Sequence, residues 1–475
     1  MSKRNRKYEA VELEVEAIGF EGVAIARKEG VVHFVKGALP GDVVRAQVMK
    51  KKKSYVETKL EDVLKPSEHR VEPLCPYFGT CGGCSWQHLA YTQQLMWKQR
   101  HVIDAFERIG KIPYGEILPT APSPREYYYR NKMEFSFGRY RWLMESEIAS
   151  GVEFDKNFAL GLHVPGFHDK VLDIEQCFIH QPVGNKILND VKAASKHYGC
   201  EAYEYRNHTG FLRNLVIRTS RATGEIMVIL VTAPPQSEME VAFVEWFETE
   251  FLKITPEATT VIHAVSHSKS SVAIGEPRLL KGEPFMIEEA LGVKYRISPF
   301  SFFQTNSYQL EHFLKTILDY ADIDENQVVW DLYCGTGSIT LPAAKRAKKV
   351  YGIEMSESSI RDARVNMELN GITNVEFFCE DLHAKETPAL LNTLEKPDVL
   401  IIDPPRAGMH KNLAEHLLEI AAPHVVYVSC NPSTQARDCE ILHQKYDVVK
   451  IQPVDMFPHT FHIESVAVLK LRDNA

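Results

Sequence analysis

The chain has 475 residues, of which 44% are hydrophobic and 25% are charged, and its formal net charge is −8. At ~150 residues per domain, this length predicts roughly three domains. The negative charge argues against a protein that coats nucleic acid over its whole surface. No apolar run reaches the ~18 residues that a membrane-spanning helix needs, and the basic segment Met1–Tyr8 lacks the apolar core of a signal peptide.

The nine cysteines indicate a reducing compartment, because no secretory signal accompanies them. In such a compartment, clustered cysteines more often bind metal or react than form disulfides. We therefore expect a cytoplasmic protein.

The N-terminal segment differs from the rest of the chain in charge. Residues 1–70 contain 15 Lys or Arg and 11 Asp or Glu, so this segment carries +4 and the remainder about −12. A basic module on an acidic body is typical of an added domain that binds a polyanion. The run Lys50–Lys53 is equally consistent with a solvated turn.

Five short strands are predicted in this segment, separated by glycines and by the turn Pro40-Gly41-Asp42. The strands span Val11–Ile18, Gly22–Ala26, Val31–Val35, Val43–Met49 and Tyr55–Leu64. Such a series predicts a small β-barrel of OB type. The order Gly19–Ala24 followed by Gly37–Asp42 resembles a TRAM domain, an RNA-binding module of RNA-modifying enzymes. We assign this domain to residues 1–67.

Three cysteines, Cys75, Cys81 and Cys84, follow within ten residues that also contain Pro and Gly. Such a compact loop can place several thiolates around one centre, and Cys177 is the best candidate for a fourth ligand. The spacing differs from that of radical-SAM enzymes, and two pairs with zinc-ribbon spacing are absent. A [4Fe–4S] cluster is the preferred prediction, and zinc is the alternative.

The central part of the chain, residues 68–299, is predicted to be an α+β domain. An amphipathic helix is expected over residues 88–110, and a hairpin over residues 211–231. Residues 127–142 alternate aromatic side chains with Arg and Lys, which offers stacking surfaces and phosphate partners for single-stranded RNA. A half-buried strand explains much of the same pattern. Arg130, Lys132 and Arg213 are the candidate RNA contacts.

From Val328 the chain alternates strands and helices, which predicts a doubly wound, mainly parallel sheet. The first strand ends in Asp331-Leu-Tyr333-Cys-Gly335-Thr-Gly337, and the second ends in Glu354, which is placed to bind a ribose. A dinucleotide site is disfavoured, because Thr340 stands where the third glycine of GxGxxG belongs. The pattern instead resembles class I S-adenosylmethionine (SAM) methyltransferases.

Three later motifs follow strands of this sheet: Asp403-Pro-Pro-Arg406, Ser429-Cys430-Asn431-Pro432, and the segment Asp455–Glu464. Adjacent strand ends lie at one edge of a sheet, so Asp403, Cys430 and Glu464 are expected to converge there. Taken alone, a Cys after a buried strand is more often a packing residue. Its neighbours make Cys430 a candidate nucleophile.

Together with Phe302-Phe-Gln304-Thr-Asn306, these motifs resemble the RNA uracil-5-methyltransferase family (TrmA/RumA type), over nearly the full chain. The TRAM-like barrel and the four cysteines make the 23S rRNA branch the most similar, and the tRNA branch less so. The resemblance implies a methyltransferase domain over residues 300–475, in a protein expected to be monomeric. It implies SAM contacts by Gln304, Tyr333, Glu354 and Asp403, with Ser338 and Asp381 as weaker candidates.

The expected chemistry begins with addition of the Cys430 thiolate to C6 of uracil, so that C5 can attack the methyl donor. Glu464 is the expected base for the C5 proton, and Asp403 is expected to orient the uracil or help activate the donor. The target must be unpaired or flipped out of a duplex. His459 and His462 are expected to position or pack. The alternatives are amino-group methylation and a non-catalytic RNA-binding protein.

Overall fold

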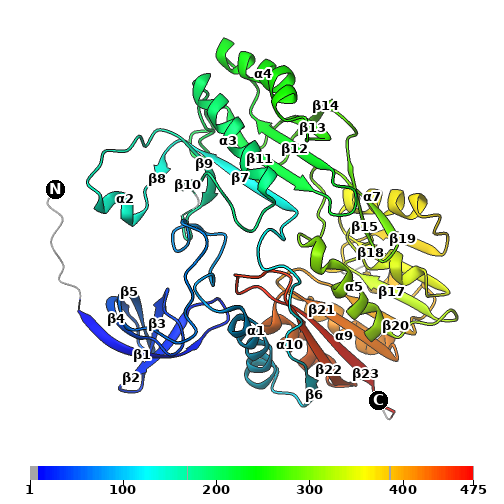
Figure 1. Ribbon diagram of the computed structural model, residues 1–475. Coiled ribbons are helices and arrows are strands. Elements are labelled where there is room, and N and C mark those ends of the chain that lie inside the picture. Colours follow the sequence, from blue (N-terminus) through cyan, green and yellow to red (C-terminus); the bar gives the residue numbers. More distant parts are fainter. Residues whose placement is uncertain (1–8, 168, 385–386, 474–475) are drawn as a thin grey trace.

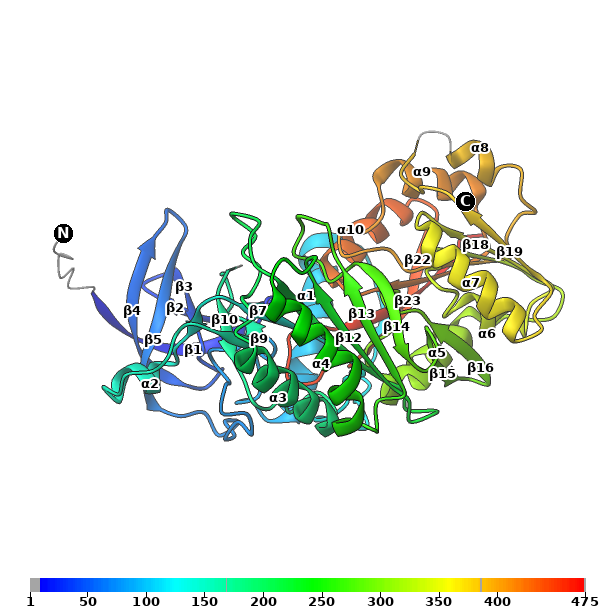
Figure 2. The same ribbon diagram turned by 90° about the horizontal axis from the view of Figure 1, so that it is seen from above.

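The computed structural model describes residues 9–167, 169–384 and 387–473. Three bodies follow one another along the chain: a small barrel, a sheet backed by helices, and a larger sheet between helices (Figure 1). Seen from above, the barrel and the larger sheet lie at opposite ends of the molecule (Figure 2). The central sheet lies between them.

The N-terminal barrel contains five strands in the order β1-β2-β3-β5-β4. Their bounds are β1 (Ala10–Ile18), β2 (Ala24–Lys28), β3 (Val31–Lys36), β4 (Val43–Lys51) and β5 (Tyr55–Lys65). Antiparallel pairing of β1 with β4 closes the barrel, so that no edge is left open. Inward side chains such as Leu13, Val15 and Val44 are buried. The five predicted strands and their closure into a barrel are confirmed.

The central sheet has eight strands in the order β14-β13-β12-β11-β7-β9-β10-β8. They are β7 (Lys132–Gly138), β8 (Arg141–Trp142), β9 (Ala159–His163), β10 (Val171–Asp173), β11 (Leu212–Thr219), β12 (Ile226–Thr232), β13 (Thr260–Val265) and β14 (Glu276–Lys281). Helices α3 (Pro182–His197) and α4 (Glu238–Ile254) share a core with this sheet, and α2 (Glu145–Ala149) lies beyond β8. The predicted hairpin is β11–β12.

The C-terminal sheet also has eight strands, in the order β19-β18-β17-β20-β21-β23-β22-β6. They are β6 (Tyr114–Ile117), β17 (Val328–Leu332), β18 (Lys349–Glu354), β19 (Val375–Cys379), β20 (Val399–Ile402), β21 (His424–Ser429), β22 (Tyr446–Val454) and β23 (Glu464–Leu471). Neighbours are parallel except at β23, which pairs antiparallel with both β21 and β22. The predicted parallel sheet is thus present, with one reversed strand.

Helices cover both faces of this sheet. They are α1 (Tyr91–Ala105), α5 (Ser307–Ala321), α6 (Thr340–Ala344), α7 (Glu357–Leu369), α8 (Thr387–Leu391), α9 (Lys411–Ile420) and α10 (Pro432–Leu442). Successive residues of a strand point to opposite faces, so Val329 of β17 packs in a core with α5 and α7. Its neighbour Trp330 packs in the second core, with α1, α9 and α10.

Part of the segment predicted as central packs with the C-terminal sheet instead. Strand β6 pairs with β22 at the sheet edge, and the π-helical turn η1 (Phe106–Gly110), which extends α1, packs on α10. The hairpin of β15 (Met286–Ala290) and β16 (Val293–Ile297) packs on α7. These contacts join parts of residues 68–299 to the C-terminal sheet, and the predicted boundary at residue 299 stays a prediction.

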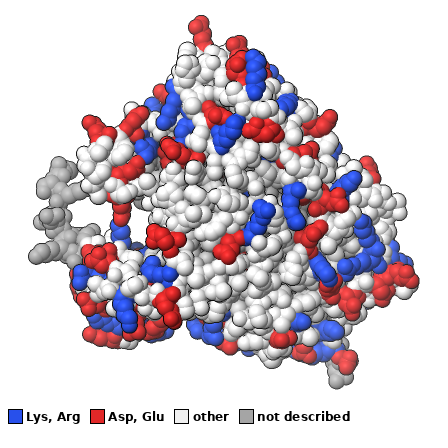
Figure 3. Space-filling view, in the orientation of Figure 1, with Lys and Arg blue, Asp and Glu red and all other residues white. Residues whose placement is uncertain are grey.

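Charged side chains are distributed unevenly over the face in Figure 3. Both signs are mixed around its rim, and a broad middle area has few of either. This face therefore has no continuous basic surface. Among the residues that the structure describes, no helix is long and apolar enough to cross a membrane.

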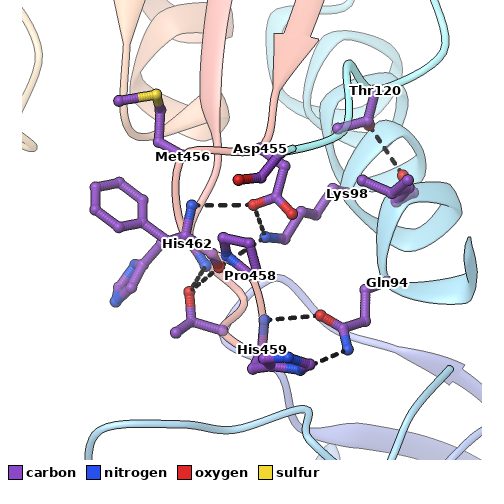
Figure 4. Close-up of polar contacts among 12 residues, drawn as sticks. Gln94, Lys98, Thr120, Asp455, Met456, Pro458, His459 and His462 are labelled. Carbon is purple, nitrogen blue, oxygen red and sulfur yellow. Dashed lines mark hydrogen bonds and ion pairs between the residues drawn. The ribbon is translucent and has the colours of Figure 1, made fainter. Parts of the chain in front are cut away.

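A buried ion pair joins α1 to the start of the loop between β22 and β23 (Figure 4). Lys98 Nζ lies 2.6 Å from Asp455 Oδ1 and donates to Phe457 O at 3.0 Å. Both charged side chains are 0% exposed. Tyr91 OH donates to the other carboxylate oxygen, Asp455 Oδ2, at 2.9 Å. The pair thus fixes the start of the 455–463 loop against α1.

Replacing Lys98 by Met is expected to lower the free energy of unfolding by about 3–5 kcal/mol, because Asp455 then stays buried without its cation. Urea unfolding followed by circular dichroism measures this change. The control Lys59→Met removes an exposed ion pair with Glu145 and is expected to cost less than about 1 kcal/mol. Equal losses in the two variants would contradict the role given to Lys98.

Candidate active site

Four predicted site residues lie at the carboxyl ends of neighbouring strands. Tyr333 follows β17, Glu354 ends β18, Asp403 follows β20 and Cys430 follows β21. These strands are parallel neighbours in the order β18-β17-β20-β21, so their carboxyl ends share one edge of the sheet. Ligands of open α/β sheets bind at this edge. These four residues therefore lie along one edge of the sheet, which includes two of the three residues expected to converge there, Asp403 and Cys430.

The turn after β17 brings backbone N–H groups to the same edge. Tyr333, Gly335 and Gly337 have φ angles of 66°, 55° and 84°, in the left-handed region that favours glycine. Gly335 N–H donates to Glu354 Oε2 at 3.3 Å, and Ser356 N–H donates to Oε1 at 2.9 Å. Glu354 is thus fixed beside the turn, as a carboxylate that can accept hydrogen bonds from hydroxyl groups.

Gln304 approaches this turn from the junction with the central sheet. The ring of its neighbour Phe303 lies 5.4 Å from that of Tyr295, and Tyr295 OH donates to Ser338 O at 3.0 Å. On the other side, Asn131 Nδ2 donates to Gln304 O at 2.9 Å. Gln304 is therefore held between β7 and the glycine turn.

Cys430 directly follows β21, and Glu464 is the first residue of β23, which runs antiparallel to β21. The last paired residues of the two strands are Ser429 and Ser465, so Cys430 and Glu464 each adjoin this pair. Burial raises the pKa of the Cys430 thiol to about 11, with the Glu464 carboxyl as the second cause and the Arg406 guanidinium acting against both.

Two carboxyl groups, the buried Glu464 and the half-buried Asp403, act on this cysteine. Burial raises the pKa of Glu464 well above its usual range, and the Asp403 carboxyl adds to the shift. Burial also raises the pKa of Asp403 to about 7, with Asp331 as the second cause. A carboxyl group with a raised pKa can accept a proton near neutral pH, which suits a general base.

Arg406 belongs to the site, although the sequence analysis gave it no role in the reaction. Its guanidinium lowers the pKa of both Cys430 and Glu464. Its Nη2 lies 2.8 Å from Nδ1 of His462. The signal was present in the sequence, because Arg406 closes the Asp-Pro-Pro-Arg motif at a strand end. A neighbouring cation of this kind favours the thiolate form of a cysteine.

The 455–463 loop leads directly into Glu464 and is held by α1. Gln94 Oε1 accepts the His459 N–H at 2.8 Å, and Gln94 Nε2 lies 3.1 Å from His459 Nδ1 (Figure 4). Burial lowers the pKa of His459 to about 3, so this imidazole is neutral at physiological pH. Its contacts give His459 a packing role.

The same loop is also held from the cysteine-rich segment and from α5. The N–H groups of Ser85 and Trp86 both donate to His459 O at 2.9 Å. Asn306, which caps α5, donates from Nδ2 to Met456 O at 3.0 Å. Sequence analysis missed these contacts, because their partners are distant along the chain and only the fold brings them together.

The four predicted cluster ligands lie around one small cavity, lined by Cys75, Cys81, Cys84 and Cys177. Burial raises the pKa of the Cys81 and Cys84 thiols to about 12. In the described ranges, no three His, Cys, Asp or Glu side chains are arranged to hold a metal ion. The predicted [4Fe–4S] cluster is therefore not confirmed and stays a prediction.

One of the three expected RNA contacts is wrong. Arg213 is 1% exposed, because its guanidinium is enclosed by Tyr203 and by the carbonyl oxygens of Ser268 and Ser270. It therefore cannot touch RNA directly. Lys132 pairs with Glu134 at 2.5 Å, and its role as an RNA contact stays a prediction, as does that of Arg130.

Known proteins are similar to this chain over more than nine tenths of its length. The family described as tRNA (uracil-5-)-methyltransferase matches residues 286–472. A protein of Bacteroides thetaiotaomicron, named an uncharacterized RNA methyltransferase, is 40% identical over 456 residues, which cover 95% of this chain and 99% of that protein. A protein of Chlorobaculum tepidum with a similar name is 41% identical over 446 residues, covering 92% of this chain and 91% of that protein.

A solved structure shares the architecture. The structure of Pyrococcus abyssi tRNA (uracil-54, C5)-methyltransferase in complex with S-adenosyl-L-homocysteine matches with a TM-score of 0.74 and 26% identity, covering 97% of this chain and 100% of that chain. The C-terminal sheet thus has the fold of SAM-dependent methyltransferases, as predicted. The chain belongs to the RNA uracil-5-methyltransferase family of the TrmA/RumA type.

Proposed function

We propose that the protein methylates C5 of a specific uridine in 23S rRNA, through a covalent adduct between Cys430 and C6 of the uracil. SAM-dependent methylation of uracil C5 in RNA follows from the family. The rRNA target and the role of each residue are the proposal. The observation that supports these roles is that Cys430 and Glu464 each adjoin the paired residues Ser429 and Ser465 at the carboxyl end of β21.

Cys430 acts first, because C5 of free uracil is a weak nucleophile. Addition of its thiolate forms an S–C6 bond and shifts the C5–C6 electron pair toward the O4 carbonyl, which gives an enolate. C5 of this enolate can attack an electrophilic carbon. Arg406 lowers the pKa of the thiol and so increases the fraction present as thiolate.

Glu464 acts after methyl transfer, when C5 carries both the new methyl group and its original proton. The carboxylate takes this proton, the C5–C6 double bond re-forms, and the S–C6 bond breaks to release the Cys430 thiolate. The raised pKa of Glu464 strengthens it as a base. Asp403, at the neighbouring strand end, is proposed to orient the uracil edge.

The methyl donor is proposed to lie against Gln304, Tyr333, Glu354 and Asp403. S-adenosylmethionine supplies the electrophilic methyl group when it is bound. An ionised carboxylate has about four acceptor positions, and Glu354 uses two of them for the N–H groups of Gly335 and Ser356. The remaining positions suit the two hydroxyl groups of a ribose.

The rRNA target is supported by the N-terminal barrel and by the four cysteines around one cavity. This combination resembles the 23S rRNA branch of the family. tRNA is the second candidate, favoured by the Pyrococcus abyssi structure, whose name gives tRNA as its substrate. Amino-group methylation is disfavoured, because Arg406 stands where those enzymes place the aromatic ring that stacks on the base.

Deleting the gene and mapping 5-methyluridine in 23S rRNA and tRNA tests both parts of this proposal. Loss of the modification at a site in 23S rRNA is expected, with tRNA unchanged. Wild-type protein and the control Cys439→Ala, which alters a buried cysteine of α10, should restore it, and Cys430→Ala should not. Loss in tRNA alone contradicts the target, and restoration by Cys430→Ala contradicts the mechanism.

Cys75, Cys81, Cys84 and Cys177 are proposed to hold a [4Fe–4S] cluster. Burial raises the pKa of all four thiols, so four thiolates are stable here only beside a positively charged centre. Iron in such a cluster supplies this charge. The cluster would also brace the adjoining Ser85–Trp86 backbone, which holds His459.

Protein purified without oxygen is expected to contain about four iron and four sulfide ions per chain. Metal and sulfide analysis of Cys81→Ala should show their loss. Cys200→Ala, which alters a buried cysteine outside the cavity, should retain them. Zinc without iron in the wild-type protein is the result that excludes the cluster.

A further inference from the structure

We propose that a hollow at the far end of the central sheet binds an unpaired nucleotide of the RNA substrate, away from the target uridine. The hollow has a volume of about 660 Å³. It is formed by the ends of β7 and β9, the chain before β10, residues 203–206, and residues 269 and 271. We call it the β7-end hollow. This inference rests on the proposed function, because it takes the ligand to be the RNA substrate.

Strand β7 connects this hollow to the active site. At its start, Asn131 N–H donates to Thr305 O at 2.9 Å, next to Gln304. At its other end, Gly138 lines the hollow, and β8, β9 and β10 lie on the side of the central sheet away from β17 (Figure 1). A seven-residue strand spans ~20 Å. At ~3.4 Å per stacked nucleotide, this distance corresponds to about six nucleotides.

The walls of the hollow present aromatic rings to solvent. Tyr140 is 55% exposed and Phe167 is 47% exposed. Phe167 is braced by Trp142, at 5.2 Å between ring centroids. Tyr203 and Tyr205 also line the hollow and are half-buried. Such rings stack on any base, which is how single-stranded nucleic acid is bound without sequence preference.

Positive charge exceeds negative charge around these rings. The lining contains Arg139, Lys170, Arg206 and Lys269, against Asp169 and Glu204 alone. Three of these cations have a carboxylate partner. Arg206 and Lys170 lie 3.0 Å and 3.8 Å from Asp169, and Arg139 lies 3.4 Å from Glu204. Lys269 is exposed and has no carboxylate within ion-pair distance among the described residues. The excess charge suits a phosphate group.

Besides the cations that line the hollow, the buried Arg213 carries a positive charge behind Tyr203 and Tyr205. Its guanidinium lies 4.4 Å from the ring centroid of Tyr203 and 5.4 Å from that of Tyr205. It donates to Ser268 O at 2.6 Å, and its Nε has no hydrogen-bond partner. In the described part of the chain it pairs with no carboxylate, although buried charges usually do. Its field therefore extends through the tyrosines toward the hollow.

The combination favours RNA over other ligands. A small anion would need the cations but not four rings, and an apolar peptide would need the rings but not the excess positive charge. A nucleotide uses both, because its base stacks and its phosphate is negative. The hollow thus adds a contact about six nucleotides from the uridine that enters the active site.

RNA fragments of two lengths test the proposal. Both contain the methylated uridine, and they extend from it by either two or ten nucleotides on each side. Affinity is measured by fluorescence anisotropy without methyl donor. Tyr140→Ala and Lys269→Ala are expected to bind the long fragment about fivefold to a hundredfold more weakly than the wild type. All proteins should bind the short fragment equally. Met239→Ala and Lys253→Ala on α4 are the matched controls.

Unchanged affinity of both hollow variants for the long fragment would overturn the proposal. Equal weakening for both fragments would also overturn it, because the substitutions would then act on the fold or the active site. The binding assay needs no turnover. The two proposals are therefore tested by different measurements. Methylation by Cys430→Ala would contradict the proposed function, whereas the binding assay tests only whether the hollow binds RNA.

Discussion

The pairing of β21 with β23 is the constraint on which the active site depends. Because β23 is the one reversed strand of the sheet, its first residue lies next to the last residues of β21. This geometry brings Cys430 and Glu464 to the same end of β21, although they are 34 residues apart in the sequence. A parallel β23 would place its first residue at the other edge. In the proposed mechanism, the reversed strand supplies the base, and the parallel strands supply the nucleophile and the donor site.

Electrostatics at this site follow from burial. Low solvent access raises the pKa of Cys430, Asp403 and Glu464 together, and Arg406 is the cation that opposes the shift at Cys430 and Glu464. The proposed reaction moves one negative charge from sulfur to the uracil ring and back, and a cation beside both groups would stabilise each stage. The loop that carries Glu464 is in turn fixed by Lys98, which keeps this arrangement in place.

Sequence alone predicted the barrel strands and the residues at the sheet edge, because both have local signals: turn glycines for the barrel, and polar motifs after apolar strands for the site. It did not predict the support of the site. Lys98 and Gln94 look like ordinary surface residues of an amphipathic helix, and only the fold brings them to the 455–463 loop. Arg213 was misassigned for the same reason, since an Arg in a strand pattern carries no sign that it is buried.

The central claim is that the Cys430 sulfur forms a covalent bond to the target uracil. RNA containing 5-fluorouridine tests it most directly. After methyl transfer, C5 carries fluorine in place of a proton, so the base cannot remove it, and the covalent adduct persists. With S-adenosylmethionine present, mass spectrometry of the digested complex should find the RNA attached to the peptide containing Cys430. No covalent complex, or attachment to another cysteine such as Cys379, would contradict the account.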